Sequence, residues 1–165
     1  MTNGFVVREI ASDEYELAGE LTVAAYRAVG ETEAAYFPEL RDVATRATLV
    51  TVLVAAEEGT GRILGSVTYV RGPGPYFEGA FGDDAAAFRM LAVAGEAQGR
   101  GVGRALLEAC IGRAREENRS SIGIYTRPFM QAAHRLYLSA GFEAVPELDW
   151  EFEPGEWLRA YRLRL

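Results

Sequence analysis

The stretch Gln98-Gly99-Arg100-Gly101-Val102-Gly103 decides the fold of this chain, because it joins two segments of different character. An apolar run, 88–93, comes before it, and an amphipathic segment, 102–117, follows it. Alternating glycines let the backbone turn sharply and let a ligand approach the main chain. The amides of the first helical turn then point at one spot, at the positive end of the helix dipole. The pattern therefore predicts an anion site between a strand and a helix, suited to a pyrophosphate.

The glycine spacing argues against two common phosphate-binding motifs. A dinucleotide fingerprint, Gly-x-Gly-x-x-Gly, would need a glycine where Arg104 or Leu106 stands. A P-loop needs a Gly-Lys pair, but all 17 basic residues of this chain are arginines. The pattern that remains is Gln-x-x-Gly-x-Gly, which is typical of a different cofactor.

The segment from Met90 to Phe142 resembles the core of the GNAT superfamily of N-acetyltransferases, which bind acetyl-coenzyme A. The stretches 91–93 and 96–107 follow that family's strand, pyrophosphate turn and helix. The family's second signature, Ala-x-x-Leu-Tyr-x-x-x-Gly-Phe, matches 133–142. One position departs from the family, because Met130 stands where an Asn is frequent, which puts a side-chain contact to the cofactor in doubt.

The resemblance implies an enzyme that moves an acetyl group from acetyl-CoA to a primary amine of a small molecule or peptide, by direct attack in a ternary complex. Tyr137 is the implied acid for the departing thiolate, and a bulge near Leu91 or Ala92 is implied to aim one amide at the thioester carbonyl. The alternative from another class is a catalytically silent acyl-CoA-binding sensor domain. The implied cofactor-binding positions are Leu91, Ala92, Val93, Gln98, Gly99, Arg100, Gly101, Val102, Gly103 and Arg104.

Other candidates for chemistry have simpler interpretations. Tyr137 shares a helix face with apolar residues, so the alternative to an acid is a core tyrosine. His134, the single histidine, lies beside that face and is expected to be solvated or at the cofactor rim, and one histidine argues against a catalytic metal site. Cys110 lies on an apolar helix stripe and is expected in the core. The base is either water or an acidic loop residue: Glu33, Glu78, Asp83, Asp84 or Glu96.

The periodicity predicts an α/β (α+β) fold, with a mixed, largely antiparallel sheet of about six to seven strands flanked by helices. The strand–helix–strand unit over 86–126 predicts one parallel pair, which carries the cofactor turn. Expected strands are 5–10, 51–57, 63–70, 86–93, 121–126 and 157–165. Expected helices are 12–29, 39–47, 102–117 and 130–139.

Chain length and net charge limit the classes of protein to which this chain can belong. The 165 residues predict a single domain, 1–165, and the net charge of −7 argues against nucleic-acid binding and favours cationic partners such as amines. No apolar stretch reaches the ~20 residues of a membrane span. One cysteine gives no internal disulfide framework, so we expect a cytoplasmic protein. The resemblance adds a homodimer as a possibility.

Overall fold

The computed structural model describes residues 3–77 and 79–165. The chain divides into two compact units, the first formed by 1–69 and 90–110, the second by 70–89 and 111–165. The three divisions fall inside continuous elements: strand β3 (Ile63–Val70), strand β4 (Ala85–Val93) and helix α4 (Val102–Glu116). The expectation of one domain over 1–165 stays a prediction.

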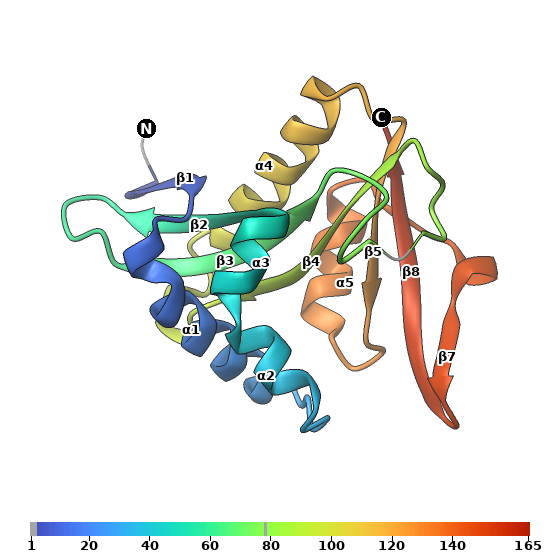
Figure 1. The fold of residues 1–165 in the computed structure, drawn as a ribbon, viewed down its shortest axis with the longest axis horizontal. Coiled ribbons are helices and arrows are strands. Elements are labelled where there is room, and N and C mark those ends of the chain that lie inside the picture. Colours follow the sequence, from blue (N-terminus) through green and yellow to red (C-terminus); the bar gives the residue numbers. More distant parts are fainter. Residues whose placement is uncertain (1–2, 78) are drawn as a thin grey trace. The chain divides into compact units, whose positions relative to one another are not determined.

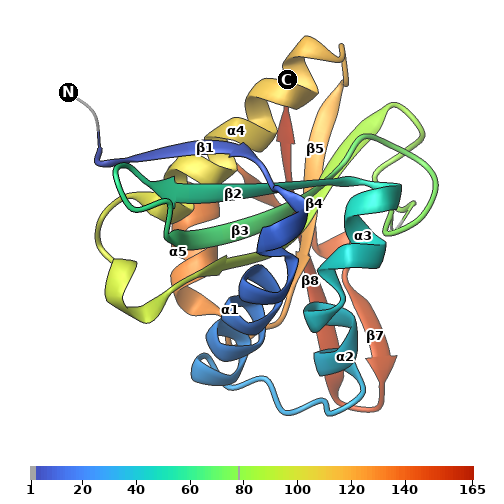
Figure 2. The same cartoon turned by 60° about the vertical axis from the view of Figure 1, so that its left-hand side comes forward.

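The first unit is built on antiparallel strands in the order β1-β2-β3, with β4 next to β3. Phe5 of β1 lies opposite Glu57 of β2. Thr51 of β2 lies opposite Tyr69 of β3, so the two strands predicted over 51–57 and 63–70 pair as an antiparallel hairpin. Figures 1 and 2 show α1, α2 and α3 on one face of these strands and the start of α4 on the other. The elements before β4 are β1 (Phe5–Glu9), η1 (Ser12–Glu14), α1 (Tyr15–Ala28), α2 (Tyr36–Arg41), α3 (Val43–Leu49), β2 (Thr51–Glu57) and β3 (Ile63–Val70).

The single helix expected over 39–47 is wrong, because the chain forms two short helices there. Asp42 separates them with a ψ of 67°, which is outside the helical range. Its carboxylate accepts a hydrogen bond of 3.2 Å from the Thr45 amide and so caps α3. Arg46 of α3 is 1% exposed, and its guanidinium donates to the Thr68 hydroxyl and the Leu40 carbonyl. These hydrogen bonds offset the free energy that the guanidinium loses when it is removed from water.

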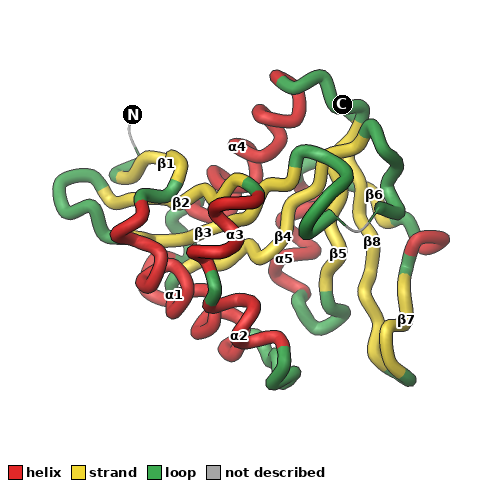
Figure 3. Tube along the Cα trace, viewed as in Figure 1, coloured by secondary structure: helices red, strands yellow, loops and turns green. Residues whose placement is uncertain are grey.

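The second unit contains the parallel pair that the sequence predicted. Ala85–Ala87 of β4 pairs with Ser121–Gly123 of β5 in parallel register. On its other edge, β5 pairs with β8 in antiparallel register. Strand β8 also pairs with two short strands that the sequence did not indicate. The trace in Figure 3 shows β5 beside β8. The remaining elements are η2 (Gly95–Ala97) in the first unit and, in the second, β5 (Ser121–Thr126), α5 (Gln131–Ser139), β6 (Glu143–Ala144), η3 (Pro146–Leu148), β7 (Trp150–Glu153) and β8 (Glu156–Arg164).

The architecture is thus a mixed α/β fold whose strand pairs are largely antiparallel, with β4 and β5 parallel, as predicted. Cys110 is fully buried, which confirms its place in the core. Over 3–77 and 79–165, no helix is both long and apolar enough to cross a membrane.

Candidate cofactor and active site

The predicted anion site is a turn of backbone amides directly before α4. Gly99 and Gly101 adopt left-handed conformations, with φ of 81° and 82°, and Arg100 between them does not. Alternation of this kind turns successive N–H groups toward one concavity, a nest that binds anions. A Cβ built on either glycine would meet no atom within 4 Å, so the turn faces open space.

The start of α4 adds donors to this nest. The first intrahelical bond runs from the Ala105 amide to the Gly101 carbonyl oxygen at 3.0 Å. Within the described ranges, the amides of Gly99, Gly101, Val102 and Gly103 donate to no backbone carbonyl. Unsatisfied amides at a helix N-terminus, backed by the helix dipole, suit a phosphate group. The residues present therefore fit the pyrophosphate of coenzyme A.

The side chains of the turn separate into an exposed set and a buried set. Gln98, Arg100 and Arg104 are exposed, which leaves two cationic side chains beside the nest. Ala97 and Val102, at 0% and 1% exposed, fix the turn against the core of the first unit. Of the predicted positions 98–104, Gln98 to Gly101 and Arg104 are therefore exposed, and the buried Val102 anchors them.

Gly65 of β3 allows the start of α4 to lie close to the strand. A Cβ at this position would lie 2.8 Å from Cγ1 of Val102, 2.9 Å from the carbonyl oxygen of Ala92 and 3.0 Å from Cδ1 of Leu106. Real side chains do not tolerate the shortest of these distances, so the helix start would have to move. Sequence reasoning gave Gly65 no role, because a glycine within a strand does not show which neighbour approaches it.

Met90 interrupts the regular conformation of β4. Its φ is 58°, which is uncommon for a residue other than glycine, and its side chain is buried with Val23 and Leu40. A left-handed residue inside a strand is a feature of β-bulges, which redirect the peptide that follows. The following amide is that of Leu91, so the kink lies beside the positions where the family resemblance implies a bulge.

The C-terminal end of β4 carries the positions predicted to pair with the pantetheine arm. The pairing of β4 with β5 covers Ala85–Ala87 and does not extend to Leu91–Val93 in the described register. On the other side β4 follows β3, and the Ala94 amide donates to the Leu64 carbonyl at 2.9 Å. Free strand edges pair with extended ligands that carry amides. The pairing of Leu91–Val93 with an extended ligand stays a prediction.

Tyr137 lies in an aromatic cluster of the second unit. It is 3% exposed, and its ring centroid lies 5.5 Å from that of Phe88, 5.9 Å from that of Phe142 and 6.0 Å from that of Tyr161. The ring therefore fills the core position that the sequence gave as the alternative interpretation. The proposed role of its hydroxyl as an acid stays a prediction.

His134 is partly buried and contacts neighbouring side chains. Its Nε2 lies 3.2 Å from the Thr126 hydroxyl, and its ring lies 5.3 Å from that of Tyr161. Burial lowers the pKa of His134, and a hydrogen bond with the backbone of Arg127 partly opposes this by raising the pKa. The Thr126 hydroxyl also donates to the sulfur of Met130 at 3.7 Å, so the thioether at the family's Asn position contacts this group.

The structure singles out no dedicated base among the acidic candidates. Glu33, Asp83, Asp84 and Glu96 are all exposed, and Glu78 lies outside the described residues.

Comparison with known proteins shows the family to which this chain belongs. The model of the acetyltransferase (GNAT) family matches residues 7–142, so the chain belongs to that family. A GCN5-related N-acetyltransferase from Kribbella flavida is 27% identical with a TM-score of 0.73, covering 98% of each chain. A ribosomal-protein-alanine N-acetyltransferase from Brucella melitensis is 26% identical with a TM-score of 0.68, covering 97% of this chain and 99% of its own.

A third structure adds a cofactor to the comparison. The yncA protein of Salmonella typhimurium, solved with acetyl-CoA, shares the fold at 23% identity and a TM-score of 0.67, covering 98% of this chain and 94% of its own. Among curated proteins, none matches this chain. The GNAT family uses acetyl-CoA as its acyl donor, which agrees with the nest at the start of α4.

Proposed function

We propose that this protein is an N-acetyltransferase that moves an acetyl group from acetyl-CoA to a primary amine of a small molecule or peptide. The observation that carries the proposal is the nest at Gly99–Gly101, placed directly before a helix in a member of the GNAT family. Its amides would hold the pyrophosphate, and the backbone of Leu91–Val93 would pair with the pantetheine arm.

The transfer is a direct attack within a ternary complex. The amine nitrogen bonds to the thioester carbonyl carbon, the carbon–sulfur bond breaks, and the amine proton passes to water. The Leu91 amide, which follows the kink at Met90, donates to the carbonyl oxygen as it gains charge. Tyr137 donates the proton that the departing thiolate takes up, and the tyrosinate regains a proton from water before the next turnover.

The acceptor is proposed to carry positive charge in addition to the reacting amine. The net charge of −7 and the carboxylates of the 71–84 loop favour cations over anions near the protein. If charge guides binding, the KM of the acceptor rises between low and physiological salt, where the screening length is about 8 Å. Preference for anionic acceptors would contradict this proposal.

The test is release of free thiol from acetyl-CoA, measured against a panel of amines, diamines, amino acids and peptides. We expect thiol release with at least one amine and none with the corresponding alcohol. Binding of acetyl-CoA by calorimetry without thiol release from any amine would instead indicate the sensor alternative. Absence of binding would reject both functions.

A further inference from the structure

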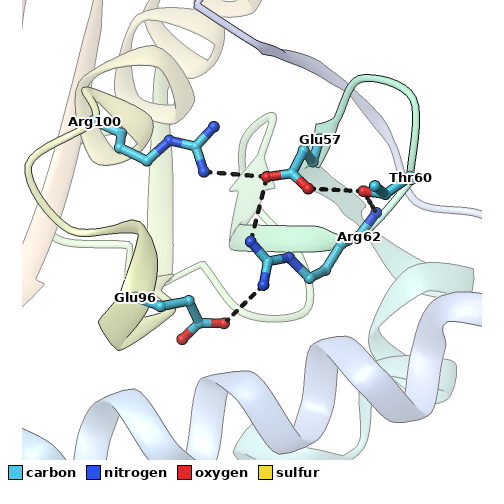
Figure 4. Close-up of polar contacts among 5 residues, drawn as sticks. All are labelled: Glu57, Thr60, Arg62, Glu96 and Arg100. Carbon is cyan, nitrogen blue, oxygen red and sulfur yellow. Dashed lines mark hydrogen bonds and ion pairs between the residues drawn. The ribbon is translucent and has the colours of Figure 1, made fainter.

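The β2–β3 hairpin of the first unit contacts the cofactor turn through one carboxylate. Glu57, the last residue of β2, accepts from Nη1 of Arg100 at 3.2 Å and from Nη2 of Arg62 at 3.3 Å, both on Oε2. Its other oxygen accepts from the Thr60 hydroxyl at 2.8 Å. Figure 4 shows these side chains converging on Glu57. Both carboxylate oxygens are therefore engaged.

A second contact reaches the other end of the same turn. Nη1 of Arg62 lies 3.8 Å from Oε1 of Glu96, which belongs to η2 just before the glycines (Figure 4). The hairpin that carries Arg62 is itself fixed, because the Glu57 amide donates to the Arg62 carbonyl at 2.8 Å. The turn is thus held on both sides by side chains that start from a paired strand.

The turn needs such support because of its own composition. Arg100 stands between two left-handed glycines, and glycine loses more conformational freedom on ordering than any other residue. The Thr60 and Arg100 hydrogen bonds hold the pKa of Glu57 below its ordinary value, so Glu57 is a carboxylate at neutral pH. A carboxylate that fixes the side chain of Arg100 also restricts the backbone between the glycines.

We propose that Glu57 is a positioning residue for the anion site, holding the Gly99–Gly101 turn in its binding conformation through Arg100. This inference rests on the proposed binding of coenzyme A at the turn. Charge alone predicts the opposite effect, because removing Glu57 would leave Arg62 and Arg100 more positive beside a bound pyrophosphate. The sign of the change in affinity therefore distinguishes positioning from simple electrostatics.

The experiment is calorimetric titration of coenzyme A, which binds without turnover, into wild type, Glu57→Gln and Arg100→Gln. Because the pair is partly exposed, we expect Glu57→Gln to bind about 2- to 5-fold more weakly, and Arg100→Gln at least as weakly. The double variant should bind within about twofold of Arg100→Gln, because Glu57 acts only through Arg100 and has no further effect once that side chain is replaced. For Glu57→Gln, the kcat at saturating acetyl-CoA should stay within about twofold of wild type, since Glu57 does not touch the reacting atoms.

Two further variants make the test specific. Glu57→Asp keeps the charge but shortens the reach to Arg100, so positioning predicts weaker binding and electrostatics predicts no change. Glu58→Gln removes the same charge from the next, exposed residue and should bind as wild type. Unchanged or tighter binding in folded Glu57→Gln, with wild type binding normally, would overturn the inference alone. Failure of wild type to bind coenzyme A would overturn the proposed function as well.

Discussion

The peptide N–H of Phe142 donates a hydrogen bond of 3.0 Å to the carbonyl oxygen of Tyr137. Gly141 lies between them with a φ of 96°, and its own N–H donates to the Leu138 carbonyl at 3.1 Å. These bonds form a Schellman cap at the end of α5, and the contact between the rings of Tyr137 and Phe142 closes it. The Tyr-x-x-x-Gly-Phe signature therefore has a structural cause besides any chemistry. A substitution that removes only the hydroxyl of Tyr137 therefore distinguishes its structural role from its proposed chemical role.

Tyr137→Phe keeps the ring and the cap and removes only the hydroxyl. We expect kcat to fall by about 10- to 100-fold, the weak end of general acid catalysis, because thiolate is a tolerable leaving group without help. The dissociation constant of acetyl-CoA should change by less than about twofold. Steady-state kinetics and thermal melting provide the measurement.

The matched control for this variant is Tyr125→Phe in the same unit. The Tyr125 hydroxyl donates to the Leu148 carbonyl at 2.8 Å, so its loss should cost about 1 kcal/mol of unfolding free energy and leave kcat unchanged. A wild-type kcat in folded Tyr137→Phe would mean that solvent protonates the thiolate.

Gly103→Val tests the nest with little backbone strain, because Gly103 is helical and its φ is not positive. Its Cβ is expected to obstruct the approach of phosphate and to weaken acetyl-CoA binding at least tenfold, about 1.4 kcal/mol. Gly112→Val in the same helix is the control, since a Cβ there meets no atom within 4 Å. Equal affinities of the two folded variants in calorimetry would remove the pyrophosphate interpretation.

Two substitutions of similar volume at Met90 test whether its left-handed conformation is required. Met90→Leu should cost less than about 1.5 kcal/mol of unfolding free energy, because volume is nearly conserved. Met90→Ile should cost about 1–3 kcal/mol more, because β-branched residues rarely adopt a φ near 58°. Urea denaturation measures both. Equal costs would indicate that the backbone at Met90 relaxes without loss.

Gly65→Ala should displace the start of α4 from β3. Overpacking of this kind costs about 1–3 kcal/mol, which lowers the Tm by roughly 2–4 °C for each kcal/mol. Acetyl-CoA affinity should fall as well, since the displaced helix carries the nest. Gly95→Ala adds the same methyl group where it meets no atom within 4 Å, and its Tm should match wild type. A wild-type Tm for Gly65→Ala would show that the helix accommodates the methyl group.

The pH dependence of stability should contain a contribution from His134. Because its pKa is lowered in the folded state, the unfolded chain takes up the proton more readily below its ordinary pKa of about 6.5. The free energy of unfolding therefore decreases as pH falls below ~6.5 and is unaffected above it. His134→Gln should lack this decrease, and since the chain has 1 histidine, the difference between the two curves isolates it. Parallel curves from about pH 7.5 to 5.5 would contradict this assignment.

The sequence predicted those features that depend on local pattern. The glycine turn before α4 follows from alternating glycines between an apolar run and an amphipathic run. Both residues of this turn that adopt a left-handed conformation, Gly99 and Gly101, belong to the predicted pattern. The parallel pair of β4 and β5 follows from a helix of sufficient length between two strands.

Features that depend on spatial neighbours could not be predicted. Gly65 matters because α4 approaches it, and Glu57 matters because Arg100 reaches it from a segment distant in the sequence. The conformation of Met90 has no local signal, because methionine does not favour a positive φ. Asp42 does have a local signal, because aspartate is a favoured N-cap residue and its carboxylate accepts from the amide three residues later. This signal would have divided the single helix expected over 39–47.

The position of Glu57 also limits how the β2–β3 hairpin can be engineered. Exposed hairpin tips ordinarily accept inserted tags or labels. Here the tip sets the spacing between Glu57 and the residues that close on it, Thr60 and Arg62. An inserted residue would change that spacing and release Arg100, so loop length and cofactor affinity should change together. The turn at Gly155 between β7 and β8, where a Cβ meets no atom within 4 Å, is the better insertion point.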